Sequence, residues 1–425
     1  MTVIDGFERA ERLGLLHATA EDERLDGRIV TVNGTRMVNF GSCGYTGLET
    51  HPSLKAAVIE AVQRYGTQFS ATRAYVSSPD YPATEAALSE LFGRPALVTS
   101  STSMANMAAI CTLTTDRDLI LIDAQAHRSV QMATMIARGQ GSEVQVVPHS
   151  NIAALSRKLT EAAGRYRRVW YLADGLYSMF GDFAPIDGLN RLVAEHPDLW
   201  LLLDDAHSVS WTGTHGRGHV LEHLSRSALD RTVVTASLNK SFGAAGGAIA
   251  FPDQAMRDQV FSYGWPMIFS GPVQPPMLAA IRASAELHLS GEIIGRQTRL
   301  RDAIRFFNTE AARRGLPLVF ENETPIRYVA AGDTASAINL AERLQKAGFL
   351  VNCASYPAVP PKRSGIRVAL TLHQRKEDII GLVESIAESL PRALADEDIS
   401  SAELVRGFHR EFAGREVTLR EVGAW

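Results

Sequence analysis

Cysteine is scarce in this sequence. The 425 residues include 3 cysteines, Cys43, Cys111 and Cys353, and no two of them form a C-x-x-C pair. A disulfide framework or a cysteine-ligated zinc site needs several cysteines at short spacing, so neither is predicted and no bound metal is expected. Two of the three thiols are interpreted as ordinary buried side chains.

Long apolar runs and long runs of like charge are also missing. No run reaches the roughly 18 apolar residues that suggest a membrane span, and the N-terminal residues lack the basic and apolar regions of a signal peptide. The 43 basic and 47 acidic residues leave a formal net charge of −4 without a charged tract. This balance argues against nucleic acid or a membrane surface as a partner, and we expect a cytoplasmic protein.

The composition, 45% hydrophobic and 21% charged, is that of a soluble enzyme. From His51 onward, helical and strand patterns alternate. The helical patterns cover Ser53–Arg64, Tyr81–Phe92, Ser103–Leu113, His127–Arg138, Ile152–Ala163 and Gly188–Glu195. The strand patterns cover Ala96–Thr99, Leu119–Asp123, Val144–Val147, Val169–Ala173, Leu199–Leu203, Thr232–Thr235 and Gly247–Phe251. Such alternation predicts an α/β fold with a mostly parallel sheet covered on both faces.

The chain is longer than one hydrophobic core usually supports, which predicts a large domain and a smaller α+β domain. We divide it into an N-terminal arm (1–50), a large domain (51–285), a small domain (286–392, with part of the arm) and a C-terminal extension (393–425). Further expected elements are an N-terminal amphipathic helix, a hairpin at Asn33-Gly34, one long helical stretch (Met277–Arg314), strands Ile326–Ala330, Leu350–Asn352 and Ile366–Ala369, and helices Ala335–Ala347, Lys376–Ser389, closed by Pro391, and Ser401–Phe412.

Lys240 is the most informative single residue. It lies among small residues shortly after the predicted strand Thr232–Thr235. A lysine amine in a confined, partly desolvated place has a lowered pKa and can form a Schiff base with a carbonyl. On this segment alone, a surface lysine that follows a strand is an equally good interpretation.

Other polar residues follow strands in the same way. In a parallel α/β sheet the ligand lies outside the carboxyl ends of the strands. The polar residues at or just after four predicted strand ends are Asp123 and His127, Asp174 and Ser178, Asp204 and His207, and Ser237 and Lys240. Together they form an inventory suited to holding an aldehyde cofactor. The run Thr99–Ser103, between a strand and a helix, suits a phosphate group, although an ordinary helix N-cap explains it too.

These residues lie in motifs that resemble the α-oxoamine synthase family of pyridoxal-phosphate enzymes, which includes a branch of α-hydroxyketone autoinducer synthases. The matching segments run from about Asn39 to His373. The motifs are Tyr45-Thr-Gly-Leu48 with His51-Pro52, Ser178-Met-Phe-Gly-Asp-Phe-Ala-Pro-Ile186, Asp204-Asp-Ala-His207, Gly213-Thr-His-Gly-Arg-Gly218 and Ser237-Leu-Asn-Lys240 with Gly246-Gly247. The resemblance implies a fold-type I pyridoxal-phosphate transferase with a seven-stranded sheet, active as a homodimer.

The resemblance also implies residue roles. Lys240 forms the Schiff base and later acts as the base at Cα, Asp204 pairs with the pyridinium nitrogen, and His127 stacks on the ring. His207 and Ser178 bond the phenolic oxygen of the cofactor. The residues implied to contact the phosphate are Ser101, Thr102, Ser103 and Ser237, and Ser270 is implied to reach the cofactor across the subunit boundary. The residues implied to bind substrate are Cys43, Tyr45, Arg73 and Arg367, of which Arg367 grips the amino-acid carboxylate.

The implied reaction is a decarboxylative acyl transfer. The carbanion at Cα of an amino acid attacks an acyl thioester of coenzyme A or a carrier protein, the thiol leaves, and loss of carbon dioxide yields an α-aminoketone. The sequence departs from the family pattern at four places: Cys43 replaces an asparagine, Phe180 an aspartate and Ser103 an aromatic residue, and the usual phosphate-contacting threonine or serine after Ser270 is absent. The amino acid and the acyl donor therefore stay open.

Other interpretations remain at this stage. Lys240, Asp204 and Arg367 alone would also serve an aminotransferase, an aldolase or a lyase on the same fold. His219-Val-Leu-Glu-His223 spells a zinc-protease signature, but it directly follows the glycine-rich G-R-G motif, where an ordinary surface helix is expected. A scaffold without turnover is the remaining alternative, and the intact lysine, aspartate and histidine argue against it.

Overall fold

The computed structural model describes residues 3–415, which divide into two compact units. The larger unit consists of residues 48–177 and 183–297, and the smaller unit of residues 3–47, 178–182 and 298–415. The sequence-based division at residues 50, 285 and 392 stays a prediction. Within residues 3–415, no helix combines the length and the hydropathy needed to cross a membrane.

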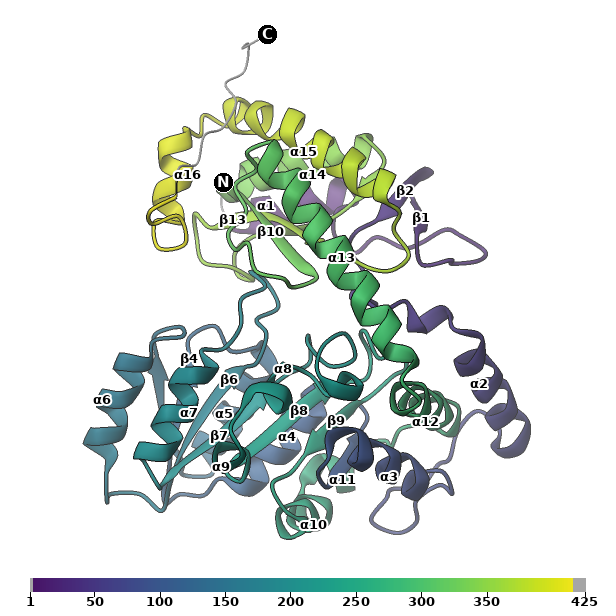
Figure 1. The fold of residues 1–425 in the computed structure, drawn as a ribbon, viewed down its shortest axis with the longest axis vertical. Helices are drawn as coiled ribbons and strands as arrows, with labels where there is room; N and C mark the ends of the chain where they lie inside the picture. The colour runs from purple at the N-terminus through teal and green to yellow at the C-terminus, as the bar shows by residue number, and fades with distance from the viewer. Residues whose placement is uncertain (1–2, 416–425) are drawn as a thin grey trace. The chain divides into compact units, whose positions relative to one another are not determined.

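The larger unit is built on a seven-stranded sheet with the order β3-β9-β8-β7-β6-β4-β5 (Figure 1). Its strands are β3 (Ala96–Thr99), β4 (Asp118–Asp123), β5 (Glu143–Val147), β6 (Arg168–Asp174), β7 (Leu199–Asp204), β8 (Thr232–Ser237) and β9 (Gly247–Ala250). Strands β5, β4, β6, β7 and β8 pair in parallel, while β9 runs antiparallel to both of its neighbours. The prediction of a mostly parallel, seven-stranded sheet is confirmed.

Both faces of the strands in the middle of this sheet are buried, which explains why they are apolar without alternation, whereas the edge strand β5 keeps exposed residues. In β4 all six residues are buried. Leu119 and Leu121 contribute to one core, whereas Ile120 and Ile122 contribute to the core on the opposite face. Helices from the same alternating sequence cover each face, so the pattern βαβ in the sequence becomes three layers in space.

The helices of the larger unit begin and end within two residues of most predicted limits. They are α2 (Pro52–Tyr65), α3 (Tyr81–Phe92), α4 (Thr102–Leu113), α5 (Arg128–Gly139), α6 (Ile152–Ala162), α7 (Ile186–Glu195), α8 (His219–His223), α9 (Arg226–Leu229), α10 (Gln254–Tyr263), α11 (Trp265–Phe269) and α12 (Pro275–Leu289). The single long helix expected over Met277–Arg314 is wrong. Two helices, α12 and α13 (Glu292–Arg313), are separated at Gly291, whose φ of 86° an α-helix does not accommodate.

The smaller unit contains two three-stranded sheets, β1-β2-β11 and β10-β13-β12. Its strands are β1 (Ile29–Val32), β2 (Thr35–Asn39), β10 (Ile326–Gly332), β11 (Phe349–Leu350), β12 (Asn352–Ala354) and β13 (Ser364–Ala369). Its remaining helices are α1 (Val3–Arg12), α14 (Thr334–Lys346), α15 (Lys376–Asp396) and α16 (Ser401–Gly407). The predicted hairpin at Asn33-Gly34 is confirmed, and both residues have positive φ, as a tight hairpin turn requires.

Three predictions for the smaller unit are wrong. The expected strand Leu350–Asn352 is two strands, because β11 pairs with β2 and β12 pairs with β13. Pro391 does not close its helix but lies inside α15, where Ala393 and Leu394 beyond it are still buried. The last helix ends at Gly407, before Phe408 and Phe412, although both phenylalanines are buried. Tertiary packing, rather than helix periodicity, accounts for the burial of these last residues.

Candidate active site

The carboxyl ends of the parallel strands bring the predicted polar residues of the larger unit to one edge of its sheet. Asp174 is paired directly with Asp204 in β6 and β7, and Asp204 with Thr235 in β7 and β8. On the next strand, β4, the chain leaves Asp123 and reaches His127 at the N-cap of α5. Residues far apart in the sequence thus become lateral neighbours.

Asp204 is buried and held by donors on two sides. Asn106 Nδ2 donates to its Oδ2 at 2.7 Å, and the Ala206 amide donates to its Oδ1 at 3.1 Å. Thr235 Oγ1 donates to Asn106 Oδ1 at 2.7 Å, which orients the amide so that its NH2 group faces Asp204. The carboxylate is therefore kept in place by hydrogen bonds to both of its oxygens.

The same amide extends the network to His127. Asn106 Nδ2 also donates to Ser129 Oγ at 2.9 Å, and that hydroxyl lies 2.7 Å from His127 Nδ1. The Ser129 amide donates to His127 Nδ1 at 3.2 Å, so Nδ1 is the acceptor and Nε2 carries the proton of the neutral ring. A directed chain of hydrogen bonds joins the aspartate to the histidine.

Charge at this edge is distributed unequally. Burial, and then the charge of Asp204, raises the pKa of Asp174 well above its usual range, so a negative charge on Asp174 is disfavoured. The pKa of His127 is lowered, mainly because its ring is partly desolvated although the residue as a whole is exposed. The negative charge of Asp204 opposes this shift, and the positive charge of Lys240 adds to it. The influence of Lys240 on both Asp174 and His127 places its charge within the network.

Lys240 is half-buried in a loop that closes on itself beyond β8. The Gly243 amide donates to Lys240 O at 3.0 Å, and the Ala244 amide donates to Leu238 O at 3.0 Å. Helix α12 holds the loop from outside: Ser284 Oγ donates to Phe242 O at 2.7 Å, and the ring of His288 stacks on Phe242 at 4.6 Å. The lysine is thus carried by a constrained loop rather than by an exposed turn.

The run Thr99–Ser103 forms the turn from β3 into α4. Ser101 is the N-cap of α4 and accepts from the Met104 amide at 3.2 Å, so its N-cap interpretation is confirmed. Thr102 Oγ1 donates to Ala236 O at 3.4 Å, Ser103 is exposed, and Ser100 Oγ lies 3.4 Å from Ser270 Oγ. The first amides of α4 and several hydroxyls therefore gather at one helix N-terminus.

Gly247 permits this turn to lie against the sheet. It pairs with Thr99 on one side and with Ser237 on the other. A Cβ at Gly247 would lie 2.6 Å from the Thr102 nitrogen and from the Ser101 carbonyl carbon. Since both are backbone atoms, no side chain can be accommodated without moving the turn. The glycine in this motif is explained by close backbone approach.

The predicted substrate residues of the smaller unit meet at Arg367. Its guanidinium is buried, and Nε donates to Ser178 O at 2.6 Å. Nη2 lies 3.6 Å from Cys43 Sγ and 3.5 Å from Tyr45 Oη. Burial raises the pKa of Tyr45 well above its usual range, so its phenol stays protonated. Ser178, implied to contact the cofactor, contributes its backbone carbonyl to this cluster.

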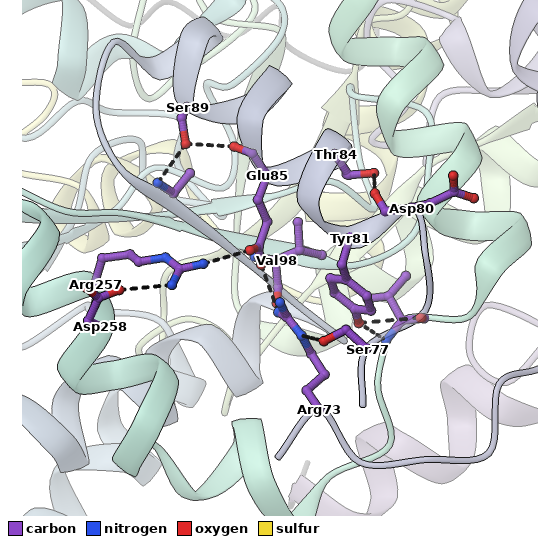
Figure 2. Close-up of polar contacts among 12 residues, drawn as sticks. Arg73, Ser77, Asp80, Tyr81, Thr84, Glu85, Ser89, Val98, Arg257 and Asp258 are labelled. Atoms are coloured by element: carbon purple, nitrogen blue, oxygen red, sulfur yellow. Dashed lines mark hydrogen bonds and ion pairs between the residues drawn. The ribbon is translucent and has the colours of Figure 1, made fainter. Parts of the chain in front are cut away.

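Arg73 has a different environment, in the larger unit. It donates to Glu85 Oε1 at 2.8 Å and lies over the ring of Tyr81 at 3.7 Å, while Arg257 donates to the other oxygen of Glu85 at 2.9 Å (Figure 2). Its side chain is only 6% exposed. These are the contacts of a buried ion-pair network, and the substrate role of Arg73 stays a prediction.

The remaining candidate residues are also located. His207 is buried after β7, and its carbonyl accepts from Trp211 Nε1 at 2.6 Å. In the zinc-protease-like segment, Glu222 accepts from Arg217 Nε at 2.8 Å, and burial lowers the pKa of His219 to about 4. Among residues 3–415, no three potential ligands are grouped to hold a metal ion.

Sequence reasoning missed three members of the network: Asn106, Ser129 and Thr235. The sequence does contain a signal for Asn106: it is the one carboxamide in helix Thr102–Leu113, which otherwise consists of small and apolar residues. A buried polar residue in such a helix needs a partner. Which partner it has depends on how α4 lies across β7 and β8, and the sequence carries no signal for that.

Comparison with known proteins places the chain in a family. Residues 35–385 match the model of aminotransferase class I and II. The 8-amino-7-oxononanoate synthase of Pseudomonas putida strain F1 is 32% identical over 372 residues, which are 87% of this chain and 92% of that protein. The chain is an α-oxoamine synthase of the aminotransferase class I and II family. It is therefore a pyridoxal-phosphate-dependent acyltransferase.

Other relatives agree with this assignment. The 8-amino-7-oxononanoate synthase of Methylococcus capsulatus is 32% identical over 369 residues, covering 86% of this chain and 92% of that protein. The solved structure of Sphingomonas wittichii serine palmitoyltransferase superposes with a TM-score of 0.82 at 25% identity, covering 93% of this chain and all of that one. The predicted fold-type I transferase fold is confirmed.

The side chains of this α-oxoamine synthase fit pyridoxal phosphate. The N-terminus of α4 with Ser101 and Thr102 is a donor-rich place for a phosphate. The Asp204 carboxylate is a fixed acceptor for a protonated pyridine nitrogen, and Lys240 offers an amine for the aldehyde. The turn that carries these donors lies directly against Gly247, where there is no room for a side chain.

Replacing Asn106 by leucine is expected to weaken cofactor binding. The substitution leaves Asp204 Oδ2 and Ser129 Oγ without their donor at a buried position, which typically costs about 1–3 kcal/mol, or about tenfold to a hundredfold in affinity. Titration of apo-protein with pyridoxal phosphate, followed by absorbance, measures the effect. Asn190→Leu, at a half-buried asparagine hydrogen-bonded to Ser225, is the control. Equal affinity for both variants would contradict the network.

Replacing Gly247 by alanine is expected to lower the free energy of unfolding by about 1–3 kcal/mol, because the new methyl group meets backbone atoms of the β3–α4 turn. Gly139→Ala is the matched control: it lies in α5 with open space at its Cβ, and alanine there should add about 0.5–1 kcal/mol. Chemical denaturation measures both. A stable Gly247→Ala protein that binds the cofactor normally would show that the close approach is not required.

Proposed function

We propose that the chain condenses an amino acid with an acyl thioester and that the amino acid loses its carboxyl group as carbon dioxide, giving an α-aminoketone. The observation that carries the proposal is the Asp204–Asn106–Ser129–His127 network with the Lys240 charge beside it. The relatives are named for an amino-oxo acid product. We propose the same class of reaction for this chain but not the same product.

The buried arginine of the smaller unit supports the amino-acid half of the reaction. Arg367 keeps its charge at all relevant pH values, and its fork matches a carboxylate in shape. Its Nε is committed to Ser178 O, which fixes the plane of the guanidinium. We assign the substrate carboxylate to Arg367, with Tyr45 as a protonated donor beside it.

The larger unit supports the proton-transfer half. When bound, pyridoxal phosphate supplies an electron sink for the pair left at Cα. In the proposal Lys240 first offers its amine to the aldehyde and then takes the proton from Cα. His127 presents Nε2–H, because Nδ1 is engaged by Ser129, and this proton can be donated to the thioester oxygen. Burial raises the pKa of Asp174, and we assign Asp204, not Asp174, as the partner of the pyridine nitrogen.

Cys43 and Phe180 separate this chain from the family pattern. Cys43 Sγ lies 3.6 Å from Arg367 Nη2, so the asparagine of the pattern is replaced by a smaller, weakly polar group directly beside the proposed carboxylate site. We therefore propose an amino-acid substrate that differs from those of the oxononanoate synthases. Coenzyme A and carrier-protein thioesters are both compatible with the proposal.

We further propose a homodimer and a cytoplasmic location. The dimer is supported by an exposed apolar patch of the larger unit, in which Thr72 Oγ1 donates to Ile268 O at 2.6 Å and so links its two segments. The members of the patch are Tyr75, Val76, Tyr263, Trp265 and Phe269, exposed between 51% and 90%. The location is supported by three free cysteines, as is usual in a reducing compartment.

The reaction is tested by incubating holoenzyme with a panel of amino acids and acyl thioesters. The proposal expects free thiol and carbon dioxide in equal amounts, both dependent on the amino acid, and an α-aminoketone by mass spectrometry. Lys240→Ala should abolish all three, because the variant lacks the amine that the proposal assigns to the aldehyde and to the proton at Cα. It should keep the fold, because Lys240 is only half-buried and lies in a loop. Formation of a keto acid from the amino acid without thiol release would instead identify an aminotransferase.

The dimer is tested by Phe269→Asp, which places a charge in the exposed patch at a residue that is 82% exposed. Light scattering after size exclusion should show a shift from dimer to monomer, because a buried unpaired charge at an interface is strongly unfavourable. Val146→Asp, on the edge strand β5 and 60% exposed, is the control and should leave the mass unchanged. A wild-type monomer would refute the dimer.

A further inference from the structure

The C-terminal segment 401–415 contributes the ring of Phe408 to a cluster of aromatic rings inside the smaller unit. Phe408 is fully buried, and its ring meets that of Phe180 edge-on, with centroids 6.3 Å apart and planes at 89°. Tyr328 on β10 contacts both, at 4.8 Å from Phe180 and 6.4 Å from Phe408. Phe180, Tyr328 and Phe408 form what we call the ring cluster, which joins three distant parts of the sequence.

Charged groups fasten the segment onto this cluster. The guanidinium of Arg363 lies over Phe180 at 4.7 Å and over Phe408 at 5.1 Å, and it also pairs with Glu411 at 2.6 Å. Further along, Arg415 donates to Leu318 O at 2.9 Å. A planar cation that contacts two perpendicular rings and pairs with a carboxylate requires a specific geometry. These contacts fix the position of segment 401–415 on the ring cluster.

Gly407 shows how closely the segment approaches. A Cβ at this position would lie 2.4 Å from Lys362 O, next to Arg363. Helix α16 ends at this glycine, and the chain then turns so that Phe408 enters the core. The end of the helix and the burial of Phe408 are parts of the same contact.

The ring cluster reaches Arg367 by two routes. Tyr328 is the direct partner of Arg367 in the antiparallel pairing of β10 and β13. Phe180 lies two residues from Ser178, whose carbonyl accepts from Arg367 Nε at 2.6 Å. The carbonyl of Gly181, which directly follows Phe180, accepts from Asn322 Nδ2 at 2.7 Å, so this loop is also tied to the segment that precedes β10. Movement of Phe180 would displace the carbonyl that orients the guanidinium.

We propose that the C-terminal segment 401–415 is a positioning element for the amino-acid carboxylate site, acting through Phe408 and Phe180 on the Ser178 carbonyl and thereby on Arg367. The proposal rests on the function proposed above, in which Arg367 binds the carboxylate. It also explains the departure at residue 180: a phenylalanine stands where the family pattern has an aspartate, because the ring of Phe408 packs against it.

The test uses full-length holoenzyme with the substitution Phe408→Ala. Two probes differ by one carboxylate: L-alanine and ethylamine, each titrated by the change in cofactor absorbance. We expect the affinity for L-alanine to fall about tenfold, as misplacing a positioned group does, and that for ethylamine to stay within about twofold. Phe408→Leu, which keeps apolar volume, should recover most of the loss.

Two controls make the outcome decisive. Leu382→Ala removes a fully buried side chain from α15, outside the ring cluster, and should leave the ratio of the two affinities unchanged. Arg367→Lys keeps the charge but loses the fork, and should weaken L-alanine alone. If Arg367→Lys leaves L-alanine binding intact, the proposed function fails. If it weakens L-alanine while Phe408→Ala has no effect, or lowers both affinities equally, only the positioning role is overturned.

Discussion

The hydrogen bond from Asn106 to Asp204 is the constraint on which the candidate active site depends. A carboxylate buried at the end of β7 needs a donor, and Asn106 supplies it while Thr235 fixes the orientation of the amide. The second hydrogen of the same amide organises Ser129 and, through it, His127. One side chain of α4 thus connects Asp204 at the end of β7 with His127 at the start of α5, and Thr235 of β8 holds its orientation.

The surrounding structure supports this arrangement by close backbone approach. Gly247 lets the β3–α4 turn rest on β9, and Gly243 comes so near to Leu48 that a Cβ there would lie 2.6 Å from the leucine Cβ. The first contact locates the helix N-terminus suited to phosphate, and the second locates the loop that carries Lys240. In both places the limiting quantity is distance between main chains, so the motif glycines contribute geometry rather than flexibility.

The smaller unit solves a different problem, which is the orientation of a buried guanidinium. Arg367 is paired across the sheet with Tyr328, a member of the ring cluster, and donates to the carbonyl of Ser178, two residues from Phe180. The residue that departs from the family pattern, Phe180, is also the one that the C-terminal segment covers. A substitution that looks like a change of substrate contact in the sequence is, in the structure, a packing contact for a segment far along the chain.

The sequence by itself determined the class of fold, the cofactor and most of the residues at the sheet edge. Alternating strand and helix patterns follow from burial on both faces of a parallel sheet, and Asp204, His127 and Lys240 lie at strand ends because those ends meet. Local signals also sufficed for the Asn33-Gly34 turn. They failed at Pro391 and Leu350–Asn352, where neighbouring elements outweigh propensity, whereas the helix break at Gly291 follows from the backbone conformation of the glycine itself. Only the tertiary structure decided that Asn106 is the donor to Asp204, that Arg73 forms an ion pair with Glu85, and that Phe408 packs on Phe180. Each of these contacts joins residues from separate elements, and its geometry depends on how those elements pack.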